Sequence, residues 1–135
     1  MICLVLFSVL CCRAQVDCVL GVGGPDGETI AEVFQLNETQ REKLKNWTAE
    51  LRIRNDYLRD KAERLIGKNQ ASPPDELLKV SVAYRAILDS MEQNIRMMDR
   101  RLLQIFNDRQ YRYYVELCGR LSLRPIHINR SVDER

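Results

Sequence analysis

Leu36–Gln40 (LNETQ) and Phe106–Gln110 (FNDRQ) are two copies of one short pattern. In each copy an apolar residue precedes Asn37 or Asn107, an acidic residue follows, and Gln comes three positions after the Asn. Asn is a favoured N-cap, an acid in the first turn suits the helix dipole, and Gln at the third position completes a capping box. An amphipathic pattern follows both copies. Each copy therefore predicts the start of a helix.

The first long helix is predicted from Asn37 to about Gly67. Its apolar residues recur at spacings of three and four, which places them on one side of a helix. Arg54 and Asn55 interrupt this stripe, either through a local adjustment of register or as a polar device that specifies pairing. The stripe consists of Leu44, Trp47, Leu51, Leu58, Ala62 and Leu65.

A second long helix is predicted from Pro73 to about Phe106, with Ser72 as its N-cap and Pro73 at its first position. Its apolar residues follow a seven-residue repeat, which predicts a coiled-coil-like seam against another helix. The repeat is formed by Leu77, Tyr84, Met91, Met98 and Ile105, with Ser81, Leu88, Ile95 and Leu102 at the partner position.

The predicted fold class is all-α. Because only about five residues connect the two long helices, they should fold back as a long antiparallel hairpin. Residues 15–35 predict a glycine-rich, flexible lead-in followed by a short helix from 28 to 35. Residues 36–122 form the main helical domain, which ends in an amphipathic closing helix over 108–121. Residues 123–135 should be a flexible tail.

The first residues are typical of a secretory leader. Residues 2–12 form an apolar run too short to span a bilayer, and Cys12 and Ala14 supply the small residues of a cleavage site. Removal of residues 1–14 as a signal peptide predicts a periplasmic or otherwise secreted protein. A lipoprotein anchor is the second alternative, because Leu10 places a large residue before Cys11 where that processing requires a small one.

Cleavage of this leader would leave two cysteines, Cys18 and Cys118, in an oxidising compartment. Two cysteines can form one bridge. The alternative is a pair of free thiols, with Cys118 buried on its helix as a small apolar residue. We expect the disulfide, because in an antiparallel hairpin the lead-in and the closing helix emerge at the same end.

The paired pattern resembles the LTxxQ-type motifs of the Spy/CpxP family of small periplasmic helical proteins, over roughly residues 36–122. Leu36, Gln40 and Gln110 match that motif, while Asn replaces its usual Thr and Phe106 replaces Leu in the second copy. The resemblance implies an ATP-independent chaperone or envelope-stress adaptor, in which two subunits pair into a cradle that holds unfolded clients.

Two other functions stay open at this point. One is a periplasmic sensor or adaptor that regulates an anti-sigma or histidine-kinase membrane partner, and the other is a structural envelope protein. No catalytic constellation is visible, because the only histidine, His127, lies in the predicted tail without a Cys or carboxylate cluster around it. We therefore expect no enzyme activity, no metal or cofactor and no small-molecule substrate. A net charge of +2 is too small to imply a nucleic-acid partner.

Arginines accumulate toward the end of the chain, and four of them are expected to steer clients or a partner: Arg96, Arg100, Arg109 and Arg112. A two-helix hairpin with one short helix has more large apolar residues than it can bury. Some apolar surface should then remain for a client or for a second subunit, so a homodimer is expected. One monomer is expected to be unable to bury all of the following set: Trp47, Leu78, Val82, Tyr84, Leu103 and Phe106.

Overall fold

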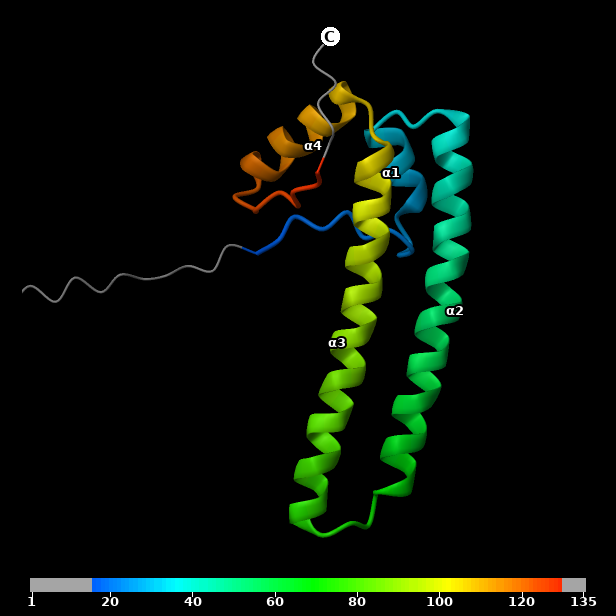
Figure 1. The fold of residues 1–135 in the computed structure, drawn as a ribbon, viewed down its shortest axis with the longest axis vertical. Helices are drawn as coiled ribbons and strands as arrows, with labels where there is room; N and C mark the ends of the chain where they lie inside the picture. The colour runs from blue at the N-terminus through cyan, green and yellow to red at the C-terminus, as the bar shows by residue number, and fades with distance from the viewer. Residues whose placement is uncertain (1–15, 130–135) are drawn as a thin grey trace, which may run out of the picture.

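The structure, a computed structural model, describes residues 16–129, and the expected leader therefore lies outside the described residues. Its regular elements are α1 (Gly27–Val33), α2 (Glu38–Lys68), α3 (Pro74–Ile105) and α4 (Asp108–Arg120). The all-α prediction is confirmed for this part of the chain. In Figure 1, α2 and α3 run side by side as two long rods, while α1 and α4 gather at the end where α2 begins and α3 ends.

The connection between α2 and α3 shows why α3 starts one residue later than predicted. Pro73 is the N-cap of α3 and has an extended backbone (φ −59°, ψ 158°), because a residue that precedes a proline avoids helical geometry. Ser72 was expected as the cap, and that expectation is wrong. Its hydroxyl lies 3.3 Å from Oδ1 of Asn69, whose Nδ2 in turn donates to the carbonyl of Leu65 at 2.7 Å.

A polar contact lies near the middle of the seam between α2 and α3, where Nδ2 of Asn94 donates to Oδ1 of Asn55 at 3.0 Å. The polar interruption in the first stripe thus meets a polar partner on the other helix. Such a half-buried amide pair favours one register of two helices over its alternatives. Fully buried seam residues on either side of the amide pair are Leu44, Leu51 and Ala62 from α2 and Ile87, Met98 and Leu102 from α3.

The seven-residue repeat of α3 faces a covering partner only in part. Near the end of α3, Met98 and Leu102 are completely buried. In the first half of the helix Leu77 and Leu88 remain 43% and 41% exposed, and the neighbouring Ile87 is buried against α2 instead. Leu88 as a seam residue is therefore a wrong prediction, because two helices can cover only a narrow strip of each other's surface.

The main core lies at the end of the molecule where all four helices meet. Leu103 and Phe106 are buried there, whereas Leu78 and Val82 stay exposed, in line with the expectation that one monomer cannot bury the whole apolar set. The cover of the buried pair comes from the segments on either side of the long helices: the rings of Phe34 and Phe106 lie 4.9 Å apart, and Tyr114 of α4 is fully buried.

The segments at both ends of the described chain, residues 16–26 and 121–129, join this core, which corrects the expectation that they are flexible. Cys18 and Val22 of the lead-in are buried, and residues 123–128 continue from α4 back across it. Asp17 and Arg124 form a parallel bridge, in which the N–H of Cys18 donates to the carbonyl of Arg124 at 2.8 Å. The glycine content of the lead-in predicted a flexible segment. That prediction failed because a local sequence pattern does not show the contacts that residues distant in the chain make with the segment. The last predicted tail residues, 130–135, lie outside the described part.

Candidate functional site

The two copies of the repeated pattern both form complete capping boxes. Oδ1 of Asn37 accepts from the N–H of Gln40 at 2.9 Å, and Oε1 of Gln40 accepts from the N–H of Asn37 at 3.0 Å. Asn107 and Gln110 repeat this arrangement at 2.9 and 2.8 Å. The apolar residues that precede them, Leu36 and Phe106, are buried.

The structure also brings the two glutamines together. Nε2 of Gln40 donates to Oε1 of Gln110 at 2.9 Å, and Nε2 of Gln110 donates back to Oε1 of Gln40 at 3.0 Å. Each amide also donates to a carbonyl at a helix end: Gln40 to Ile105 at the end of α3, and Gln110 to Phe34 at the end of α1, with a longer bond to Gln35 at 3.4 Å. All four helices are thereby joined at one buried point, which makes this pair a structural junction.

A second junction fastens the two chain ends to α3 and α4. Cys18 and Cys118 form a disulfide, in agreement with the sequence prediction. Beside it, the hydroxyl of Tyr114 donates to the carbonyl of Cys18 at 2.7 Å and accepts from the N–H of Ile126 at 2.9 Å. The buried hydroxyl therefore uses both its donor and its acceptor capacity.

Asp99 of α3 is the charged centre of this second junction, and the sequence did not single it out. Its carboxylate accepts from the N–H groups of Leu20, Gly21 and Val22 at 2.8, 3.3 and 2.9 Å. Burial raises the pKa of Asp99, and the three N–H groups offset part of that increase by stabilising the charged form. In the sequence Asp99 cannot be told from the many solvated acids of the same helices.

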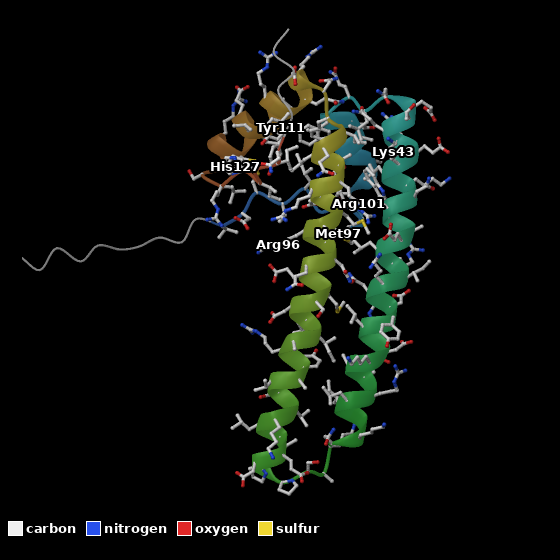
Figure 2. All side chains as sticks on the ribbon, in the orientation of Figure 1. Lys43, Arg96, Met97, Arg101, Tyr111 and His127 are labelled. Atoms are coloured by element: carbon white, nitrogen blue, oxygen red, sulfur yellow. A yellow bond between two sulfur atoms is a disulfide. The ribbon has the colours of Figure 1, made fainter. Side chains whose placement is uncertain are left out.

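The four arginines expected to steer clients do not form one patch. Arg96 is bound in ion pairs with Asp17 at 3.0 Å and Glu92 at 2.8 Å, and Arg100 lies near Asp17. Arg109 and Arg112 line a separate shallow cavity on α4 together with Tyr113. Figure 2 shows Arg96 on the side of α3 away from α2, whereas Arg101 lies on the side near α2.

Arg101, which was not among the four arginines, is used within the fold. It forms an ion pair with Glu50 of α2 at 2.7 Å.

A different surface combines apolar side chains with unpaired cations. Beyond the part that α1 and α4 cover, a groove of about 490 Å³ runs between α2 and α3. Its floor is formed by Leu58, Leu65 and Ile87. We call it the distal groove, and the remaining residues that line it are Lys61, Arg64, Lys68, Ala83, Ala86 and Ser90.

The cations of the distal groove have no counterion among the described residues. Lys61, Arg64 and Lys68 take part in none of the ion pairs of residues 16–129, in contrast to Arg54 and Arg59 of the same helix. They follow one another at spacings of three and four, so they form one row along α2. The sequence patterns of α2 alone did not identify this row of cations. The row lines a groove only because small residues of α3 lie across from it.

Large apolar side chains are also exposed on the same uncovered half of the helices. Leu78 and Val82, one turn apart on α3, are 69% and 67% exposed. Tyr57 and Ile66 are exposed on the same half of α2, and Ile53 is exposed just before it. A single exposed apolar residue is ordinary, but so many on two adjacent helices are typical of an interaction surface.

Comparison of the chain with protein-family models, curated proteins and solved structures gives no significant match. The resemblance to the Spy/CpxP family therefore rests on the two motifs themselves. Within residues 16–129 no helix is both long and apolar enough to cross a membrane. In the same range, no three His, Cys, Asp or Glu side chains are grouped so that they could hold a metal ion.

Proposed function

We propose that this protein holds apolar polypeptide segments on the uncovered half of α2 and α3, as an ATP-independent chaperone or stress adaptor. The observation that carries the proposal is the contrast between the two ends of the molecule. One end has a dense core closed by two junctions, while the other exposes large apolar side chains such as Leu78 and Val82 and also carries the unpaired cations of the distal groove. Exposed apolar surface of this extent on a folded protein is typical of an interaction site.

The cations give the surface a second role. Lys and Arg have apolar stems that cover hydrophobic surface and charged heads that stay in water, so they tolerate chemically diverse segments. Attraction between exposed charges is screened beyond about 8 Å at physiological salt, whereas apolar contact is not. Association with clients should therefore slow as salt rises, while holding persists. Arg100, Arg109 and Arg112 are exposed and add to this steering.

The protein is also proposed to act in the periplasm or another secreted location and as a homodimer. Export agrees with the expected leader and with the disulfide, because such bonds persist in oxidising compartments. For the dimer, the stripe that contains Leu77 and Leu88 is the natural surface. Near Ile95 the lead-in covers this stripe. Between Leu77 and Leu88, in the first half of α3, no described segment covers it.

The proposal is tested by the ability of the purified chain to suppress aggregation of two unrelated proteins, one reduced and one heated. Suppression of both is expected, with marked weakening in L78S/V82S and little change in V115S/L121S, which removes exposed apolar side chains from the opposite end. Failure to delay either client at equimolar amounts would reject the chaperone. Recovery of one stoichiometric partner by crosslinking, without general suppression, would instead support the sensor or adaptor.

A further inference from the structure

The two walls of the distal groove are unlike each other. The α2 wall is high and positively charged, with Lys61, Arg64 and Lys68 in a row. The α3 wall is low, because Ala83, Ala86 and Ser90 project little beyond the backbone at nearly the same spacings. Small residues in such a row let another backbone approach closely, and the cations opposite favour a partner of negative charge.

The dimensions of the groove fit a helix. From Leu58 to Lys68 the groove extends for about 15 Å at 1.5 Å per residue, or roughly three helical turns. The Cα atoms of the cations are spaced along α2 by three and four residues, about 4.5 and 6 Å. Acids on one face of a parallel or antiparallel helix have the same spacings, whereas acids on one face of an extended strand are about 6.8 Å apart and lose register.

We propose that the distal groove binds a third helix, an amphipathic and acidic segment of a partner protein. Its apolar face lies on Leu58, Leu65 and Ile87, its backbone approaches Ala83 and Ala86, and its acidic side chains face Lys61, Arg64 and Lys68. The groove then has the packing of a three-helix bundle, which two helices alone cannot provide. This inference rests on the proposed function and specifies the chemistry of the segment that the surface holds.

The Asn55–Asn94 pair marks the boundary between the covered and the uncovered half of the two long helices. Between that pair and the capped end, the lead-in and α1 already cover one side of the two long helices, with Val22 and Ile30 buried. On the other half, toward residues 69–73, no described segment does so (Figure 1).

The test uses the full chain and a fluorescent peptide of about 14 residues, or four turns. The peptide carries Leu on one face and Glu in a row beside it. Such a peptide is only marginally helical alone, so binding should increase its helicity in circular dichroism. Three comparison peptides have a central Pro that blocks the helix, Lys in place of Glu, or a scrambled order. Only the first peptide should bind well, and its affinity should fall as salt rises.

Matched variants of the protein locate the binding. K61Q/R64Q/K68Q removes the row of cations and should lower the affinity for the peptide about tenfold. This is the size of effect expected from the loss of a few partly exposed ion pairs. K43Q/K45Q/R52Q removes the same charge from exposed positions of α2 outside the groove and should change affinity less than about twofold. A83L/A86L fills the low wall, keeps every charge and should also weaken binding.

Equal binding of the Pro peptide would overturn the helical partner while leaving general holding of extended segments intact. Equal effects of the two triple variants would overturn the site. Binding of anionic lipid vesicles that depends on Lys61, Arg64 and Lys68, without peptide binding, would replace the helix by a lipid surface. The proposed function is judged separately by the aggregation assay, so its failure can be distinguished from each of these outcomes.

Discussion

Gln40 and Gln110 hydrogen-bond to each other through both amide groups, at 2.9 and 3.0 Å, although 70 residues separate them in the chain. Each glutamine also caps its own helix, so Oε1 of each accepts from a cap N–H and from the partner amide. Both side chains are 6% exposed, and no buried side-chain N or O atom of the described chain lacks a partner. The repeated sequence pattern is therefore two halves of one junction.

Replacement of either glutamine by Ala should destabilise the protein by about 2 kcal/mol, because the other amide is left buried with unsatisfied groups. The double variant should cost clearly less than the sum of the two single variants, since the second replacement removes groups that are already unpaired. Urea unfolding of the four proteins measures this coupling. Q104A, an exposed residue of α3, is the control and should be nearly neutral. Strict additivity would show that the amides act only as separate caps.

The disulfide should contribute a large part of the stability of the capped end. Its cysteines are 100 residues apart, and a loop of that size is worth up to about 4.7 kcal/mol in the chain-entropy model. C18S/C118S should unfold at a lower temperature than the wild type. A reductant should lower the unfolding temperature of the wild type toward that of the variant and leave the variant unchanged. Peptide mapping without reduction should recover the two cysteines linked. Two thiols that alkylate readily in the oxidised protein would contradict the bond.

Gly23 is required where the lead-in crosses α2. Its φ is +88°, and an added Cβ would lie 2.3 Å from Cδ2 of the buried Leu51. G23A should therefore lower the free energy of unfolding by more than the roughly 1 kcal/mol of backbone strain alone. G21A, with φ +76° and open space around it, should show only that strain. G67A, inside α2 with open space, should stabilise by up to about 1 kcal/mol because Ala favours a helix.

Asp99 and Asp17 should give stability opposite dependences on pH. Burial raises the pKa of Asp99 above 3.8, so the folded state holds this proton more tightly than the unfolded state. The contribution of Asp99 therefore falls as pH rises from about 3.8 through its folded pKa. The hydrogen bond from Arg124 lowers the pKa of Asp17 below 3.8, so its contribution is present above that pH and is lost as pH falls.

The measurement is urea unfolding of the wild type, D99N and D17N from pH 3 upward. The wild-type advantage over D99N should shrink as pH rises, and the advantage over D17N should shrink as pH falls. In D99N the amide oxygen can still accept a hydrogen bond from the lead-in. The titration of Asp99 is therefore identified by how the difference in unfolding free energy changes with pH, and not by its absolute size. Parallel curves for the wild type and D99N would mean that Asp99 does not titrate differently on folding.

Local signals in the sequence predicted most of the helices well. The Asn and Gln of each capping box lie within one turn, and apolar spacing of three and four needs no distant partner to be recognised, so α2, α3 and α4 begin and end close to where the patterns place them. The pairing of Cys18 with Cys118 followed from counting the cysteines that remain once the expected leader is removed. These features depend on residues that are near in sequence or few in number.

The relationships that hold the molecule together could not be predicted in the same way. Asp99 has the same local surroundings as a solvated acid, and only the fold brings the N–H groups of Leu20 and Val22 to it. The seven-residue repeat correctly marked an apolar stripe on α3 but could not tell which helix would cover it, and so it placed Leu88 in the seam instead of Ile87. The distal groove depends on two helices at once.

The homodimer is tested best at Leu88, because this residue is exposed in the monomer and its replacement should leave the fold intact. L88E should retain wild-type helicity in circular dichroism but sediment as a monomer at concentrations where the wild type is a dimer, since a charge buried in an apolar interface is not tolerated. L78E is the control: Leu78 is exposed on another side of α3 and should leave dimerisation unchanged. A wild-type protein that stays monomeric at high concentration would assign the stripe of Leu77 and Leu88 to clients instead of a second subunit.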